Sequence, residues 1–199
     1  MDLHEAANSI QSDLGDLADS VEARERDVLV RCQAAHIADV LGRLKDGSVQ
    51  CDYLSFLTAA DYPPTDEAEG HMDLWYHLRS QGRRLEILVS ASIARDGESV
   101  RTVSDLFPTA EWHERECYDL LGVVFAGHRD LTRILLPDEW RGHPLRKDYS
   151  EDQTDLTYTP EKRWPEVAEA RKRGGGGAAK PKPKPKPKPK PEDDADKGD

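Results

Sequence analysis

The chain has 199 residues and a formal charge of −11, from 28 Lys and Arg against 39 Asp and Glu. Residues 174–199 hold seven Lys and five acids, a charge of +2, so residues 1–173 carry −13. The length fits one domain with a tail. Because a body this acidic repels a phosphate backbone, the charge argues against nucleic acid as a main partner.

Three further function classes are disfavoured by simple patterns. No apolar run approaches the ~18–20 residues that cross a bilayer. The acidic, polar start does not resemble a secretory signal. Cys32, Cys51 and Cys117 form an odd set without CxxC spacing, which predicts a reducing compartment and no disulfide framework.

The first fifty residues predict two helices and one strand. Apolar residues recur at helical spacing over residues 2–19, which indicates a short amphipathic helix. Residues 27–31 form a strand candidate. A second one-faced helix is predicted over residues 32–45, ended by Gly47.

Three strand candidates follow, over residues 51–58, 72–79 and 84–91. The second and third alternate cleanly between apolar and polar side chains. Gly82 lies in their short link and favours a β-hairpin. The order α-β-α-β-β-β predicts an α+β fold, with helices packed on one face of a mixed, mostly antiparallel sheet.

A further helix is predicted over residues 110–121, capped by Thr109 and followed by Gly122. Residues 123–125 are apolar. Residues 126–165 contain four prolines and no long periodic segment. An irregular stretch of that length is unusual in a compact domain, so we interpret it as an extended arm that lies on another protein.

The sequence thus divides into four parts: an N-terminal helix (1–20), an α+β domain (21–125), an extended partner-binding arm (126–173) and a disordered tail (174–199). The tail contains six Lys-Pro dipeptides in succession. Such a run favours polyproline II and would project roughly 35–40 Å. It is interpreted as a solvated spacer or as a basic tether to anionic lipid or an acidic neighbour.

One polar cluster, HERECYD at residues 113–119, invites a metal interpretation. His113 and Cys117 share a helix face, and His128 and His143 are further candidate ligands, but a zincin helix needs a second His where Cys117 stands. The alternative is that Cys117 is a small buried hydrophobe. Carboxylates such as Glu114 then form ion pairs rather than perform acid-base catalysis.

A second cluster, WRGHPLRKDY at residues 140–149, interleaves bases, an acid and aromatics on a segment that cannot be a regular helix. Trp, Tyr and Arg dominate interface energies. The cluster therefore predicts a docking strip.

Together the two clusters resemble a known family. ERECYDLLGVVFAGHRDL at residues 114–131, followed by RILLPDEWRGHPLRKDY at residues 133–149, closely resembles the signature of the C subunit of NADH:quinone oxidoreductase (respiratory complex I), which is related to the mitochondrial 30-kilodalton subunit. The resemblance covers roughly residues 25–160. The sequence departs from the family pattern at Arg129, Thr132 and Ser150.

The resemblance implies a non-catalytic hydrophilic subunit in the peripheral arm of a proton-translocating complex. Such a subunit braces the D subunit, which holds the quinone site, lies near the B and I subunits, and sits on the cytoplasmic side of the cell membrane. It contacts the membrane indirectly, through the complex. The Lys-Pro tail lies outside the resemblance and is a further candidate contact with the membrane. FMN, iron–sulfur clusters and quinone are expected on partner subunits, with no cofactor, metal or catalytic residue on this chain.

The predicted partner-binding residues all lie in the two motifs. They are Glu114, Arg115, Asp119, His128, Arg133, Trp140, His143, Leu145, Arg146, Lys147 and Asp148. Two other functions stay open. One is the equivalent subunit of an F420- or ferredoxin-linked quinone oxidoreductase or of a membrane-bound hydrogenase. The other is a free-standing metal-dependent hydrolase that uses His113, Glu114 and Cys117.

Overall fold

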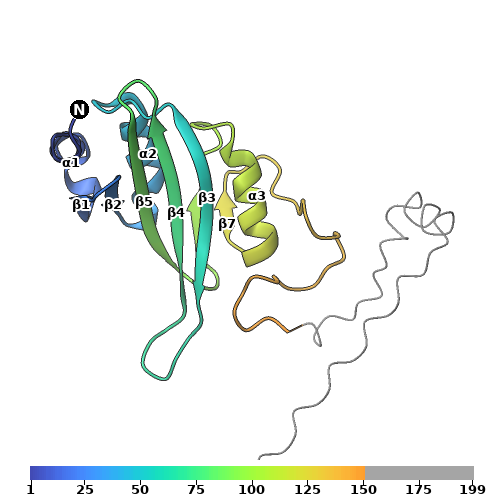
Figure 1. The fold of residues 1–199 in the computed structure, drawn as a ribbon. Coiled ribbons are helices and arrows are strands. Elements are labelled where there is room, and N and C mark those ends of the chain that lie inside the picture. Colours follow the sequence, from blue (N-terminus) through green and yellow to red (C-terminus); the bar gives the residue numbers. More distant parts are fainter. Residues whose placement is uncertain (151–199) are drawn as a thin grey trace, which may run out of the picture. The chain divides into compact units, whose positions relative to one another are not determined.

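The computed structural model describes residues 1–150, which build three α-helices and seven strands (Figure 1). The elements in chain order are α1 (Leu3–Leu14), a 3₁₀ turn (Gly15–Leu17), β1 (Ser20–Ala23), β2 (Val28–Arg31), a second 3₁₀ turn (Ala34–His36), α2 (Ile37–Asp46), β3 (Tyr53–Tyr62), β4 (His71–Ser80), β5 (Leu85–Ala94), β6 (Ser99–Arg101), α3 (Ala110–Leu121) and β7 (Val124–Ala126). The α+β class is therefore confirmed.

The main sheet has five strands in the order β1-β2-β5-β4-β3. Only β2 and β5 run parallel, and the other pairs are antiparallel, so the sheet is mixed as predicted. Strands β6 and β7 form a separate parallel pair. The β4–β5 hairpin is also confirmed, although Arg84 and not Gly82 adopts the left-handed backbone conformation, at φ 55°.

The alternating pattern of β4 and β5 explains where the core lies. Met72, Leu74, Tyr76 and Leu78 are fully buried on one face, and the apolar residues of β5 join them in one cluster. Figure 1 shows α2 behind the strands, on the covered side of the sheet. A two-residue period places one face toward the helices and leaves the other face to solvent.

The N-terminal helix shares this core. Asp2 and Glu5 form a capping box that begins α1. Ile10 and Leu14 on α1 pack with the buried face of α2 in the same cluster. As predicted, α2 ends at Gly47, whose backbone N–H donates to the carbonyl of Arg43 at 2.8 Å.

Helix α3 packs against β3, the edge strand of the sheet. The Cys117 thiol donates to the carbonyl of Leu57 at 3.8 Å. Thr109 does not cap α3 through its side chain, contrary to expectation, because its hydroxyl donates to the carbonyl of Leu54 at 3.2 Å. An edge strand with unpaired carbonyls can pair with a strand of another chain. Because α3 covers the edge of β3, it hinders such pairing.

Three strands were not predicted, namely β1, β6 and β7, of which β7 overlaps residues 123–125, recognised from sequence only as apolar. Strand β1 has no fully buried residue, and β6 has three residues, so neither carries a usable periodic pattern. Residues 127–150 contain no helix or strand, as predicted. The rest of the predicted arm, residues 151–173, and the tail at 174–199 lie outside the described residues. Within residues 1–150, no helix combines the length and apolarity that a bilayer span requires.

Candidate functional site

Both sequence motifs meet around helix α3. The irregular segment 127–150, for which we keep the name arm, follows β7 and passes along α3 before the described chain ends (Figure 1). Because irregular backbone lacks its own hydrogen-bond ladder, its N–H and C=O groups need other partners. Some of these groups bond within the arm, and others bond to residues of α3.

Asp119 organises the first half of the arm. It is fully buried, and its Oδ2 accepts the backbone N–H groups of Ile134, Leu135 and Leu136 at 3.0, 2.7 and 2.9 Å. Oδ1 accepts from Arg133 Nη1 at 2.8 Å. Burial alone would raise the pKa of Asp119, but these donors outweigh it and hold the pKa below its ordinary value. The carboxylate is therefore a charged, satisfied anchor.

Arg133 continues this network across the arm. Its Nη2 donates to the carbonyls of Trp140 and Gly142 at 3.1 and 3.0 Å. Its Nη1 also donates to the main-chain carbonyl of Asp119 at 2.9 Å. One guanidinium thus joins α3 to two segments of the arm, as its fixed fork of five donors allows.

The second half of the arm caps the end of α3. Gly122 ends the helix in the left-handed conformation at φ 80°. His143 Nδ1 donates to the carbonyl of Asp119 at 3.0 Å, the backbone N–H of Leu145 to that of Leu120 at 3.0 Å, and Arg146 Nε to that of Leu121 at 2.7 Å. These carbonyls have no partner within the helix, and a cation suits their negative dipole end.

His143 acts here as a neutral donor. Its burial, together with the positive charges of Arg146 and Arg133, lowers the pKa of the imidazole. Because a carbonyl can only accept, the contact with Asp119 requires the proton on Nδ1. A Cβ at Gly122 would lie 2.7 Å from the His143 ring, so the packing leaves room only for glycine.

The arm ends on an ion-pair cluster that sequence reasoning missed. Arg95 makes two-pronged hydrogen bonds to Asp61, at 2.6 and 3.0 Å, and to Asp148, at 2.8 and 2.6 Å. Asp61 also accepts the backbone N–H of Lys147 at 2.7 Å. The contact with Arg95 lowers the pKa of Asp61 and of Asp148. Arg146 Nη1 contributes a further pair with Asp96 at 2.7 Å.

Glu114 joins α3 to the loop that follows β6. It is fully buried, and it accepts from Thr102 Oγ1 at 2.5 Å and from the backbone N–H of Val103 at 2.7 Å. Burial raises the pKa of Glu114 despite these donors. His128 Nε2 lies 3.9 Å from its carboxylate and 3.2 Å from the carbonyl of Glu111. The Glu114 carboxylate therefore stabilises the packing of α3 against this loop.

Arg115 secures the start of the arm. It donates to the carbonyl and the hydroxyl of Thr132 at 3.1 and 2.7 Å, and it pairs with Asp130 at 3.5 Å. Its guanidinium also lies over the ring of Trp112, 5.5 Å from the centroid. Cation–π contacts of this kind orient an exposed indole.

The metal interpretation gains no support from this geometry. The Cys117 thiol points into the core toward β3, and burial raises its pKa. Among residues 1–150, no group of three or more His, Cys, Asp and Glu side chains is placed to hold a metal ion. Cys117 therefore takes the role of a small buried hydrophobe.

Most predicted partner-binding residues make contacts within the chain. Glu114 and Asp119 are fully buried, while Leu145, Lys147 and Asp148 are exposed. The others are partly buried, as the preceding contacts require; they are Arg115, His128, Arg133, Trp140, His143 and Arg146. Their role in binding a partner stays a prediction. Glu114 and Asp119 are buried, so they act on a partner only through the residues that they hold in place.

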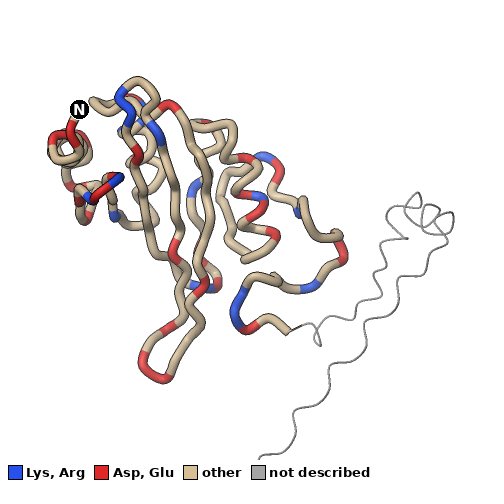
Figure 2. Tube along the Cα trace, in the orientation of Figure 1, with Lys and Arg blue, Asp and Glu red and all other residues tan. Residues whose placement is uncertain are grey.

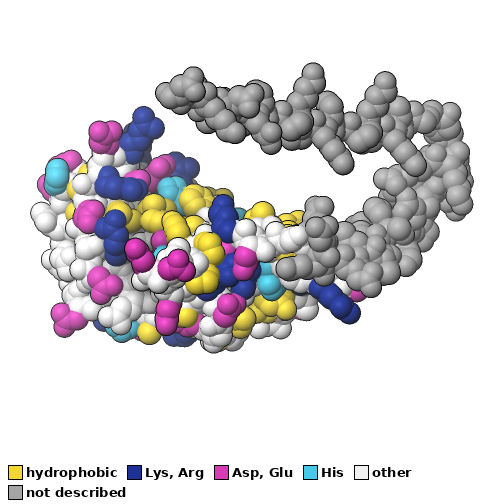
Figure 3. Space-filling view, turned by 90° about the horizontal axis from the view of Figure 1, so that it is seen from below, with side chains coloured by type: hydrophobic (Ala, Val, Ile, Leu, Met, Phe, Trp, Pro, Cys, Tyr) yellow, Lys and Arg dark blue, Asp and Glu magenta, His cyan; other side chains and the backbone are white. Residues whose placement is uncertain are grey.

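Three apolar side chains stand out on the surface of this region. Trp112 is 59%, Leu135 57% and Leu145 55% exposed. Trp112 and Leu135 were missed from sequence, because helix periodicity and motif spacing do not report exposure. Basic and acidic residues alternate along the arm (Figure 2), and Figure 3 shows apolar and charged side chains interleaved on one face of the molecule. Apolar anchors among charges are typical of an interface.

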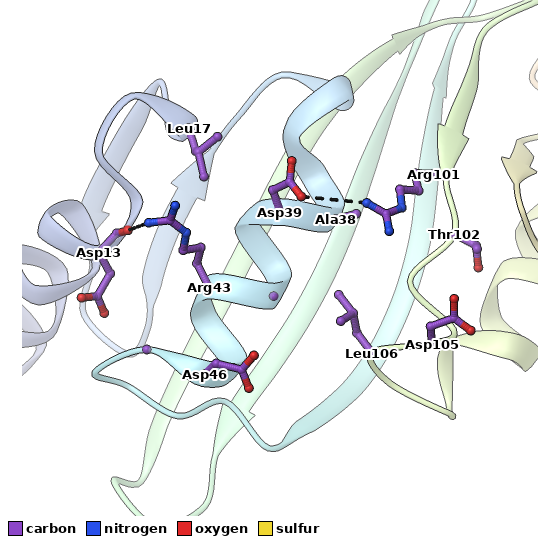
Figure 4. A pocket seen from close by; sticks show the side chains of 12 residues that line it. Asp13, Leu17, Ala38, Asp39, Arg43, Asp46, Arg101, Thr102, Asp105 and Leu106 are labelled. Carbon is purple, nitrogen blue, oxygen red and sulfur yellow. Dashed lines mark hydrogen bonds and ion pairs between the residues drawn. The ribbon is translucent and has the colours of Figure 1, made fainter.

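A hollow of about 610 Å³ lies elsewhere, between α1, α2 and the loop after β6 (Figure 4). Its basic side chains already have partners in the fold. Arg43 Nη1 donates to the carbonyl of Asp13 at 3.0 Å, and Arg101 lies 3.9 Å from Asp39. None of the predicted partner-binding residues lines this hollow. We therefore place the candidate site on the arm and α3.

Comparisons with known proteins agree with the motif analysis. The C subunit of the NADH-quinone oxidoreductase of Salinispora tropica is 35% identical over 136 residues, which cover 68% of this chain and 55% of the relative. The combined C/D subunit of the NADH-quinone oxidoreductase of Shewanella oneidensis is 36% identical over 124 residues, 60% of this chain and 21% of the relative. The chain thus spans about half the length of the first relative and a smaller part of the second.

A solved structure shares the fold. A chain of the membrane-bound sulfane sulfur reductase, an archaeal respiratory membrane complex, matches with a TM-score of 0.64 and 28% identity, covering 81% of this chain and 91% of that chain. Residues 30–155 match the family model of the respiratory-chain NADH dehydrogenase 30 Kd subunit. The matched range contains both motifs and the whole arm. The chain therefore belongs to the 30-kilodalton subunit family of respiratory-chain NADH dehydrogenase.

Proposed function

We propose that this chain is a hydrophilic peripheral-arm subunit of a proton-translocating NADH:quinone oxidoreductase and acts there as a brace. In this role it supports electron transfer from NADH through iron–sulfur clusters to quinone without performing a chemical step itself. FMN, the clusters and quinone belong to partner subunits. The chain sits peripherally on the cytoplasmic side of the membrane.

One observation carries this proposal: Asp119 holds the backbone of residues 134–136, and the central side chain, Leu135, remains 57% exposed. The motif residues thus form an ordered surface and display an apolar side chain on it. A loop that is already in its bound shape loses less entropy on association. The family signature accordingly encodes a docking surface.

The D subunit, which holds the quinone site, is the proposed main partner. In the relatives named as combined C/D subunits, a C-like segment is part of a much longer chain, of which this sequence covers only 21% in Shewanella oneidensis. Fusion keeps two interacting segments at high effective concentration. The B and I subunits are proposed as further neighbours.

The test is co-purification from detergent-extracted membranes of the native host. We expect the tagged chain to bring down the D subunit and the NADH-oxidising subunits, and Leu135→Glu to reduce the recovery of the D subunit strongly, because a charge is then placed in an apolar contact. Gln11→Glu on the exposed side of α1 adds the same charge away from the arm and should leave recovery unchanged. Unchanged recovery with Leu135→Glu would refute the proposed surface.

A second candidate is the equivalent subunit of a respiratory complex with another electron donor. The fold similarity to a chain of the sulfane sulfur reductase complex favours it, since that match covers most of both chains. The co-purified partners distinguish the two. A flavoprotein that oxidises NADH supports the first function, and its absence beside a ferredoxin- or F420-linked module supports the second.

A further inference from the structure

The uncovered face of the main sheet carries a row of aromatic side chains. Tyr53, Phe56 and Tyr62 on β3 are 41%, 40% and 45% exposed, and all three project from the same face. Trp75 lies on that face of β4, opposite Thr58. In Figure 1, α2 lies behind these strands and no described element lies in front of them.

Two aromatic side chains of the row stack on histidines of β4. Phe56 stacks on His77 with ring centroids 5.1 Å apart, and Tyr62 stacks on His71 at 4.7 Å. Charged residues on the same face have partners within the sheet. Asp73, on the middle strand β4, accepts from the Ser92 hydroxyl at 2.5 Å and lies 3.8 Å from His71. Arg79 pairs with Glu86 at 3.2 Å and Arg31 with Glu22 at 2.8 Å. Exposed aromatic side chains among paired charges are typical of a protein interface.

The arm reaches one corner of this face. Tyr62 and His71 are register partners, and Ala94 pairs with His71 on the other side. Arg95, the next residue, holds Asp148 of the arm. The end of the arm and the aromatic row are therefore neighbours at the ends of β3 and β5.

The face is too small to form a stable interface without a neighbouring surface. Three strands of ten residues cover roughly 33 Å by 14 Å, or about 450 Å². A stable interface usually buries about 800 Å² on each partner. The face alone is therefore smaller than a stable interface, and the exposed apolar residues of the arm extend it.

We infer that the aromatic face of β3 and β4 is the second half of the docking surface for the D subunit. This inference rests on the proposed function. The fused relatives supply the choice of occupant, because the segment joined to the C-like part is the D part. One partner that follows the arm to its end meets the Tyr62–His71 corner.

The test places a photo-cross-linking phenylalanine analogue at Phe56 in the full chain within the assembled complex. A second variant carries the analogue at Tyr62, and the control carries it at Gln11 on α1, which is also exposed. We expect covalent adducts with the D subunit at both aromatic positions and none at the control. Aromatic analogues preserve the side-chain type, so the fold should persist.

Several outcomes would overturn the inference: an adduct with another subunit, with a second copy of this chain, or with residues 151–199 of the same chain, or no adduct at either position. If the D subunit co-purifies while the adduct is missing, only this inference fails. If the D subunit never co-purifies, the proposed function fails first.

Discussion

The buried carboxylate of Asp119 accepts the backbone N–H of Leu135 at 2.7 Å, while the Leu135 side chain points away and is exposed. This relationship links the two parts of the family signature. The acidic residue of the helix holds the loop, and the loop presents the apolar group. The motif residues therefore contact one another within this chain, and these contacts order the surface that the loop presents.

Removing the charge of Asp119 tests this link. Asp119→Asn keeps the shape but directs an amide toward donors that need an acceptor. We expect the free energy of unfolding to fall by about 2–3 kcal/mol. Urea denaturation measures it, and Asp138→Asn, an exposed acid of the arm, is the control that should stay within about 0.5 kcal/mol. Equal stability of the two variants would contradict the anchoring role of Asp119.

Gly122 provides a second test, because its surroundings are crowded whereas those of Gly82 are open. At Gly122, φ is 80° and an added Cβ would lie 2.7 Å from His143 and 2.8 Å from Arg146. Gly122→Ala should therefore cost at least about 1–2 kcal/mol and speed hydrogen exchange in the second half of the arm. At Gly82 a Cβ meets nothing within 4 Å, so Gly82→Ala should change neither measurement. Slow exchange retained in Gly122→Ala would count against this packing.

The fold was largely predictable where a local pattern reports it. Strands β4 and β5 follow from alternation, and the end of α3 follows from Gly122. Strand β1 escaped detection because none of its four residues is fully buried. The predicted cap at Thr109 was wrong because its hydroxyl is directed at β3, where it donates to the carbonyl of Leu54, 55 residues earlier in the chain.

The candidate site was predictable in its residues but not in their contacts. The motifs identify Asp119, Arg133 and Arg146, yet their spacing does not say that Arg133 binds Asp119 or that Arg146 binds the carbonyl of Leu121. Arg95 reaches Asp61 and Asp148 over 34 and 53 residues. A sequence pattern carries no signal for contacts over that distance, so these ion pairs appear only once the sheet and arm are assembled.

The Asp61–Arg95 pair predicts a pH dependence. Because Arg95 lowers the pKa of Asp61, the carboxylate stabilises the fold above its unfolded pKa near 4, and this contribution is lost as the pH falls through the lowered value. Asp61→Asn should lower the free energy of unfolding by about 3 kcal/mol at pH 7. Its stability should also decline less steeply than that of the wild type below about pH 4.

Urea denaturation at a series of pH values measures this difference. Asp66→Asn, in the exposed loop between β3 and β4, should follow the wild-type curve throughout. Parallel curves for Asp61→Asn and the wild type would show that the pair does not contribute to acid sensitivity.

Glu114 acts in the opposite direction. Because burial raises its pKa, its contribution to the stability of the fold weakens as the pH rises through that value.

Arg146 connects the stability of the arm to assembly. It donates to the carbonyl of Leu121 at the end of α3 and pairs with Asp96, so Arg146→Ala removes one of the three donors that cap α3 and loosens the second half of the arm. We expect unfolding to become easier by about 1–3 kcal/mol and recovery of the D subunit to fall. Arg141→Ala, an exposed arginine of the same arm, should leave stability unchanged. If Arg146→Ala assembles normally although its arm exchanges hydrogen faster, an ordered arm is not required for docking.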